Sequence, residues 1–225
     1  MPAGLQIFNE SGTIIVSEAF KNYHLIEKGT FVIPAGDSTT GGSFSFTRTG
    51  RTFPVLAIRA SVLVGSSEQV VSGGSLTRAF YTKINSSSTT VEFWLFDVLS
   101  TPPATFGLEV YNSLGQLTYA SGQAPMRVVG DVLMSGYTNT SETFSAGRTY
   151  ASVQSFSGLA QDNTEGPPDF FVTKGLLGMA SWSGTTITCK RNFTDTITGQ
   201  FDEDIPGFSY EFQPPRWLII DVTNL

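Results

Sequence analysis

Histidine and cysteine supply much of the nucleophilic and acid–base chemistry of enzymes, and each occurs once in this chain, as His24 and Cys189. A Ser-His-Asp or Cys-His arrangement would have to use His24. The sequence has no Gly-x-Ser-x-Gly segment, the nucleophile motif of many hydrolases. We therefore interpret His24 as a surface or hairpin-edge residue. A single cysteine makes no intrachain disulfide and no cysteine-based zinc site, so we expect Cys189 to be a reduced, half-buried strand residue.

Acidic side chains gather in two segments that carry ligand types suited to calcium. One is Asp202–Asp204 with Asp195 nearby, and the other is Asp162–Gly166. Hard cations bind through several oxygen ligands, but the first segment does not have the spacing of an EF-hand loop. We favour solvated acidic loops, because charge runs in loops usually face water. A carboxylate pair for glycoside hydrolysis depends on separation in space, so that hypothesis stays open.

Aromatic side chains are abundant, with 18 Phe, 7 Tyr and 3 Trp. Most must fill a core, because packed sheets bury alternate residues of each strand. Tyr137 and Tyr150, which lie beside small polar residues, are the better candidates for a platform on which a sugar ring stacks. Packing in the core or in an interface is the alternative for both residues.

The charge balance argues against two classes of partner. The net charge is −6, and the 13 Lys and Arg residues form no basic stripe for phosphates, so we expect no nucleic-acid binding. No apolar run approaches the roughly 20 residues of a membrane span. The N-terminus lacks the basic region and apolar core of a signal peptide. The Gly-rich pieces lack the phosphate-loop pattern, and we expect no cofactor.

Strand-forming and turn-forming residues dominate the rest of the chain. Charged residues are only 14%, and Thr, Val, Ile, Phe and Tyr alternate with Ser and 23 Gly. With no sustained helical period, this pattern predicts an all-β fold of sandwich or barrel type. Turn clusters, among them Gly136–Ser141 and Asp162–Asp169, separate the segments. The expected strands are Thr30–Pro34, Gly42–Thr47, Pro54–Val64, Ser75–Ile84, Thr90–Val98, Met126–Met134, Arg148–Phe156, Phe170–Thr173, Gly178–Ser183, Thr185–Lys190, Phe208–Phe212 and Trp217–Val222.

Two further segments predict β-hairpins, Gly4–Ser17 and Gly107–Ser121. They share a Gly-Leu start, alternating apolar residues and a turn that opens on Asn and closes on Gly. Asn suits the first turn position, and Gly suits the left-handed residue that closes a short loop. The structural turn residues are Asn9 and Gly12 in the first hairpin and Asn112 and Gly115 in the second.

A second similarity links the two halves of the chain. Trp94-Leu95 and Trp217-Leu218 each begin a run that leads to Asp-Val, and we expect both tryptophans in the core or in an interface. We interpret the similar hairpins and the similar Trp-Leu segments as an internal duplication with units 1–102 and 103–225. The Pro-rich joint Ser100–Ala104 is a natural boundary. The expected architecture is two similar β-sandwich-like units that pack together.

The opening residues, the two Gly-Leu hairpins and the segment Ala124–Val129 resemble a family of small proteins that tailed bacteriophages and prophages encode among their tail genes. The resemblance is clearest over residues 2–17 and 104–130. It implies a virion component at the distal tail, near the central fibre or host-recognition apparatus, assembled in the host cytoplasm. The motifs are structural, so the family implies no catalytic residues.

We therefore expect a non-enzymatic structural component of a phage tail tip, which supports the central fibre or the host-recognition apparatus. Virions use closed symmetry, so we expect a homo-oligomer, with a trimer favoured, in contact with other tail proteins. The second hypothesis is a carbohydrate- or receptor-binding β-sandwich module whose ligand is a bacterial surface glycan. The third is a tail-borne polysaccharide hydrolase.

Overall fold

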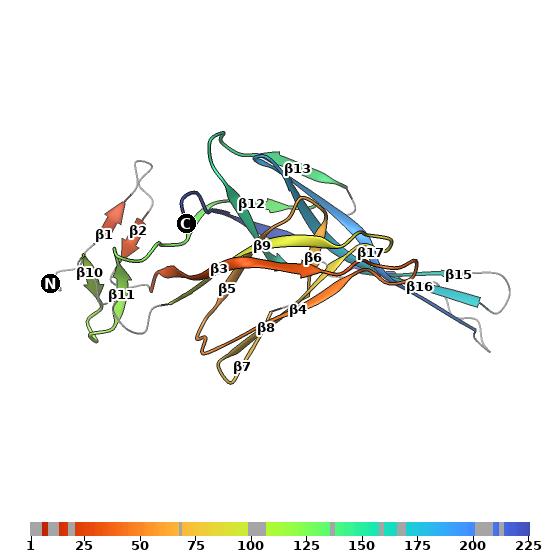
Figure 1. Ribbon diagram of the computed structural model, residues 1–225, viewed down its shortest axis with the longest axis horizontal. Helices are drawn as coiled ribbons and strands as arrows, with labels where there is room; N and C mark the ends of the chain where they lie inside the picture. Colours follow the sequence, from red (N-terminus) through yellow and green to blue (C-terminus); the bar gives the residue numbers. More distant parts are fainter. Residues whose placement is uncertain are drawn as a thin grey trace.

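The structure is a computed structural model that describes residues 6–8, 14–17, 21–67, 69–98, 107–135, 138–157, 160–165, 170–200, 209–211 and 214–225. Within these ranges the chain forms 19 strands and no helix, which confirms the predicted all-β class. None of the described residues forms a helix long and apolar enough to cross a membrane. The strands make two large antiparallel sheets and two separate hairpins (Figure 1).

Both predicted hairpins form, and they lie next to each other at one end of the molecule (Figure 1). β1 (Gln6–Phe8) pairs with β2 (Ile14–Ser17), and β10 (Glu109–Tyr111) pairs with β11 (Leu117–Ala120). Their registers correspond at an interval of 103 residues. Gln6 pairs with Ser17 as Glu109 pairs with Ala120. The register shifts after Ile7 in the first hairpin and after Val110 in the second.

The first large sheet has six strands in the order β12-β19-β14-β5-β9-β3. Three strands come from each half of the chain, and Ser152 pairs with Ile58 where the halves meet. The interval of 103 residues recurs, because the register shifts after Leu25 in one edge strand and after Val128 in the other. The strands are β3 (Tyr23–Ile33), β5 (Val55–Arg59), β9 (Thr89–Val98), β12 (Arg127–Leu133), β14 (Tyr150–Phe156) and β19 (Arg216–Asp221).

The second large sheet has nine strands, six of them in the path β13-β17-β16-β6-β8-β4. Its halves meet where Met179 pairs with Gly65. The path consists of β4 (Ser43–Thr49), β6 (Val64–Ser66), β8 (Ser75–Thr82), β13 (Thr140–Thr143), β16 (Phe170–Ser183) and β17 (Thr186–Gln200). The branches are β7 (Val70–Ser72) on β8, β15 (Ala160–Glu165) on β16, and β18 (Ser209–Glu211) on β15.

Each large sheet has a symmetric strand order. If each strand of the first half is matched with one strand of the second half in chain order, the order from one edge of a sheet is the same as the order from the other edge. The match assigns β3, β4, β5, β6, β8 and β9 to β12, β13, β14, β16, β17 and β19. Both sheets therefore continue from one half of the chain into the other. The predicted joint Ser100–Ala104 lies outside the described residues.

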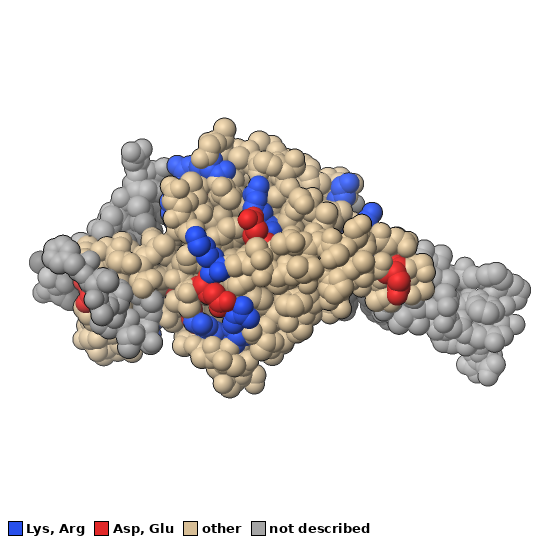
Figure 2. All heavy atoms as spheres, in the orientation of Figure 1, with Lys and Arg blue, Asp and Glu red and all other residues tan. Residues whose placement is uncertain are grey.

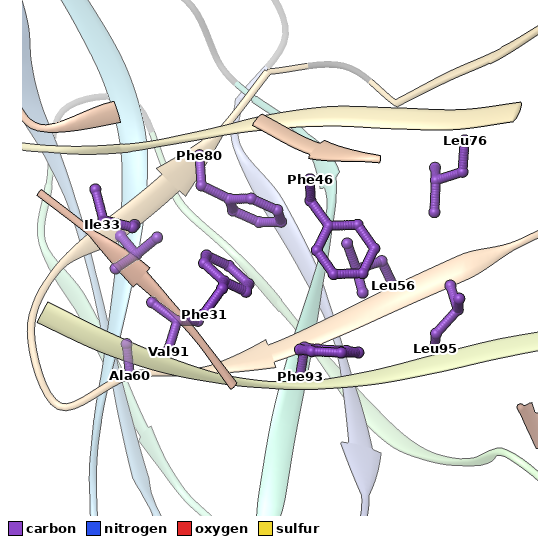
Figure 3. Packing of buried hydrophobic residues seen from close by; sticks show 11 residues of the cluster. Phe31, Ile33, Phe46, Leu56, Ala60, Leu76, Phe80, Val91, Phe93 and Leu95 are labelled. Atoms are coloured by element: carbon purple, nitrogen blue, oxygen red, sulfur yellow. The ribbon is translucent and has the colours of Figure 1, made fainter. Parts of the chain in front are cut away.

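The two sheets face each other across apolar clusters. In the first half, Phe31 and Phe93 of the six-stranded sheet contact Phe46 and Phe80 of the other sheet (Figure 3). The centroids of the contacting rings in this group are 4.9–6.2 Å apart. Such tilted and edge arrangements add specificity to the area that these rings bury.

Two more clusters complete the core. One lies between the sheets in the second half, and its members are Val132, Met134, Tyr150, Ala180, Trp182, Ile187, Cys189, Trp217 and Ile219. The other covers the outer face of the six-stranded sheet, because its members alternate along the strands with residues that face the other sheet. It draws on both halves and comprises Ala57, Trp94, Phe96, Ala151, Val153, Ile220 and Val222.

Several elements differ from their predicted bounds. Phe170–Ser183 is one strand rather than two, and its partner strand continues past the predicted end at Lys190 to Gln200. Pro54–Val64, predicted as one strand, is divided into β5 and β6. Thr140–Thr143 and Ala160–Glu165, which overlap predicted turns, are strands. Their partners in neighbouring strands supply the backbone hydrogen bonds, and a polar local composition does not reveal such pairing.

Candidate functional site

The turn of the second hairpin is held by the two residues that the sequence singles out. The side-chain carbonyl of Asn112 accepts hydrogen bonds from the backbone N–H of Leu114 at 3.0 Å and of Gln116 at 2.9 Å. Gly115 has φ of +71° and donates its N–H to the Asn112 carbonyl at 2.9 Å. This conformation is strained for a β-branched residue. The corresponding turn residues Asn9 and Gly12 lie outside the described residues.

The second hairpin is attached to the body of the protein by main-chain hydrogen bonds. The N–H of Asn22 donates to the Thr118 carbonyl, and the N–H of Leu25 donates to the Ala124 carbonyl, both at 2.8 Å. The N–H of Met126 returns a bond of 2.8 Å to Tyr23. These bonds join the start of β3 and the residue before it to β11 and to the segment that follows β11, so the hairpin is a fixed part of the surface.

His24 lies inside this joint, so the prediction of a surface or hairpin-edge residue is wrong as to its exposure. The side chain is fully buried between the start of β3 and the second hairpin, with the Tyr119 ring 5.7 Å away. Nδ1 lies 3.4 Å from the Gln123 carbonyl, and Nε2 is buried without a hydrogen-bond partner. Burial lowers the pKa of the imidazole, so His24 is a neutral packing residue at pH 7.

Cys189 is a strand residue of β17, and it is fully rather than half buried. It packs in the second-half core beside Ile187 and Trp182. Burial first, and then the charge of Glu142, raise the pKa of the thiol to about 12. A thiol with such a pKa is a poor nucleophile at neutral pH, because the thiolate is the reactive form.

The two tyrosines proposed as sugar platforms have different positions. The Tyr150 ring is 2% exposed in the second-half core, and its hydroxyl donates to the Ser145 carbonyl at 3.1 Å. A ligand at the surface therefore has no access to this ring. Tyr137 lies outside the described residues. Both tryptophans named from the sequence, Trp94 and Trp217, are buried.

The acidic segments give no assembled cation site in the part of the chain with described side chains. There, no three His, Cys, Asp or Glu side chains come together as metal ligands. The segment Asp202–Asp204 lies outside the described residues. Asp195 and Asp162 are strand residues, in β17 and β15, so neither belongs to the loop that the sequence suggested.

Exposed apolar residues along β12 were missed by the sequence reasoning. β12 is an edge strand of the six-stranded sheet, and Val128 and Leu133 are 51% and 55% exposed on its outer face. Between them Asp131 pairs with Arg216 at 2.7 Å. The signal in the sequence is Val128-Val129-Gly130, where two adjacent apolar residues break the alternation that buries a strand. Exposed apolar edges tend to pair with another chain.

The outer face of the nine-stranded sheet carries hydroxyl groups instead. Cross-strand hydroxyl contacts join Thr47 to Thr77 at 3.5 Å in one half. In the other half they join Ser141 to Thr188 at 3.0 Å and Thr143 to Thr186 at 2.9 Å. Figure 2 shows Lys, Arg, Asp and Glu side chains at separate places on the face of the described surface that is turned to the viewer. Hydroxyl groups suit hydrogen bonding to neutral polar partners.

Comparisons with known proteins returned nothing similar. No model of a known protein family matches the chain, no curated protein matches it, and no solved structure matches its fold.

Proposed function

We propose that this protein is a non-enzymatic structural component of a phage tail tip, which supports the central fibre or the host-recognition apparatus. The observation that carries the proposal is the pair of hairpins with one common register, because the resemblance to phage tail proteins rests on their motifs. The second hairpin is bonded to the body by its backbone, so it presents a fixed surface to a neighbour. Leu108, Tyr111 and Leu114 are exposed on it.

We also propose that the chain arose by internal duplication, with units 1–102 and 103–225. Three correspondences support this: the hairpin registers, the register shifts in the edge strands, and the strand order of both sheets. Two of the three keep one interval of 103 residues, as a duplication would produce. The units are joined side by side through β5 with β14 and β6 with β16.

For the assembled state we propose a homo-oligomer, with a trimer favoured, in which β12 and the outer face beside it contact a second copy. Val128 and Leu133 supply apolar area at the edge. The ion pair of Asp131 and Arg216 is already formed within the chain, so it adds no unpaired charge to an interface. The oligomer would be assembled in the host cytoplasm and would contact other tail proteins within the virion.

A carbohydrate- or receptor-binding role is the second candidate, and the hydroxyl face of the nine-stranded sheet favours it. Side-chain hydroxyls both donate and accept, as sugar hydroxyls do. In this reading the ligand is a bacterial surface glycan and the binding surface is flat. Free protein should then bind host cells, and Thr47→Val with Thr77→Val should weaken that binding several-fold.

The test of the main proposal is immunogold electron microscopy on particles from the producing strain, with antibody against this protein. Label confined to the distal end of tails is the expected result. Antibody against a head protein serves as the control for access and specificity. Intact tailed particles that carry head label but no label for this protein would overturn the virion role. Sedimentation of the purified protein then measures the oligomeric state separately.

A further inference from the structure

Arg78 is a cation buried between the two large sheets, close to the place where the halves of the chain meet. Along β8 every second residue is buried, and Arg78 takes an inward position between Leu76 and Phe80. Ion pairs to carboxylates join five other arginines, but none among the described residues joins Arg78. Burial lowers the pKa of its guanidinium to about 10, which leaves it charged at neutral pH.

Neutral groups surround the guanidinium. Nε donates to the Ser66 hydroxyl at 2.9 Å and to the Ser67 carbonyl at 3.3 Å, and Nη2 donates to the Gln154 carbonyl. The Gln154 side chain is held by Ser66 at one end, at 2.7 and 2.9 Å, and by the Gly178 carbonyl at the other, at 2.7 Å. These dipoles orient the guanidinium but leave its positive charge uncompensated, and such a buried charge is costly.

A small cavity lies against this network. Its volume is about 10 Å³, enough for one water molecule or an ion of similar size. Arg78, Ser66, Ser152 and Gln154 form its polar wall, and apolar side chains such as Phe80 and Trp217 close it. Arginine has five N–H donors, and the bonds above use only Nε and Nη2. Donors therefore remain for an acceptor beside the side chain.

We propose that this cavity binds a small monovalent anion, with chloride as the ligand at physiological salt and Arg78 as its main donor. One negative charge at this place neutralises the buried guanidinium. The small volume selects against polyatomic anions such as phosphate, and the apolar wall favours an ion that sheds its water readily. The anion contacts β6 and β8 from one half and β14 from the other, so it links the two halves.

The experiment is thermal unfolding of the full chain at constant ionic strength while chloride replaces gluconate, an anion too large for the cavity. We expect the Tm of the wild type to rise with the logarithm of the chloride concentration above the Kd, by about 5–10 °C at 100 times the Kd. Arg78→Met keeps much of the volume and removes the charge, and its Tm should not respond to chloride. Arg48→Met is the matched control, because Arg48 lies in an ion pair near the surface and should leave the response intact.

A second measurement keeps the test decisive if Arg78→Met fails to fold. Wild-type crystals soaked in bromide should show an anomalous peak within hydrogen-bond distance of the Arg78 guanidinium. An equal response of wild type and Arg78→Met to chloride would overturn the proposal. So would bromide-soaked crystals without a peak in the cavity, because the cavity would then hold water only.

Discussion

Trp94 and Trp217 lie on opposite faces of the same six-stranded sheet. Trp217 is 1% exposed and faces the nine-stranded sheet within the second-half core. Trp94 is 8% exposed and belongs to the cluster on the outer face. The Trp-Leu similarity between the two strands therefore does not place the tryptophans at equivalent positions, although both are buried.

Asp97 and Asp221, in contrast, have corresponding partners in the register of the six-stranded sheet. In the strand register, Asp97 lies opposite His24 of β3, and Asp221 lies opposite Arg127 of β12. His24 and Arg127 are 103 residues apart. Both carboxylates are buried acceptors of hydrogen bonds. Burial raises the pKa of Asp221, but bonds from Thr223 and Arg148 outweigh it and hold the pKa below its usual value. A buried aspartate near the C-terminal end of the strand is therefore common to β9 and β19.

The indole of Trp94 has a buried N–H without an acceptor, and that of Trp182 donates to the Ser152 hydroxyl at 3.3 Å. Trp94→Phe removes an unsatisfied donor, which offsets part of the cost of the smaller buried ring, so we expect the free energy of unfolding to fall by no more than about 1 kcal/mol. Trp182→Phe removes the same ring volume and also breaks the hydrogen bond to the Ser152 hydroxyl, which keeps only its own bond to the Ile58 carbonyl at 3.4 Å, so we expect a loss larger by about 1–2 kcal/mol. Urea unfolding measures both. A loss for Trp94→Phe as large as that for Trp182→Phe would contradict the prediction, because both substitutions remove the same ring volume.

Gly115→Val should destabilise the protein by about 1–2 kcal/mol, because it forces a β-branched residue to φ of +71°. A Cβ at this position meets no atom within 4 Å, so strain and not collision causes the loss. Gly115→Asn is the matched control, and we expect a smaller loss because Asn tolerates this conformation. Urea unfolding of both variants checks the prediction, and equal losses would assign the effect to something other than φ.

The features that sequence reasoning predicted are those whose cause is local. Asn112 and Gly115 act within a few residues of each other, and their turn forms as expected. The long β16 and β17 were missed, because their polar segments are strands only through their pairing with each other. Arg78 and Ser66 come from neighbouring strands, but their partner Gln154 is distant in the chain. No spacing of residues in the sequence could therefore predict the hydrogen bonds among these three side chains. His24 was misplaced for the same reason, since the second hairpin buries it.

The joint between β3 and the second hairpin should weaken as the pH falls below 6.5. Burial lowers the pKa of His24 in the folded state, so below 6.5 the unfolded chain takes up a proton that the folded chain excludes. Stability is therefore fully present above pH 6.5 and is lost as the pH falls toward the lowered pKa, by at most about 1.4 kcal/mol per pH unit. Thermal unfolding between pH 8 and 5 measures this loss.

The control for this pH dependence is His24→Gln, which removes the imidazole and keeps a polar side chain at the joint. Its stability should be nearly constant over the same range, because the lowered pKa of Asp221 acts only at lower pH. A wild-type curve as flat as that of His24→Gln would contradict the prediction. Hydrogen exchange at the amides of Leu25 and Met126, which bond the hairpin segment, locates the loss.

Val128→Lys together with Leu133→Lys should dissociate the proposed oligomer while the monomer stays folded. Both side chains are more than half exposed, so lysine at either position keeps its charge in water in the free chain. In a contact between copies the same charges would be buried without partners, which costs several kcal/mol.

Val70→Lys with Val71→Lys is the matched control, because these residues are exposed on β7, away from β12. Sedimentation velocity should show monomer for the first pair and oligomer for the second. Loss of the oligomer in the control alone would move the interface to the nine-stranded sheet.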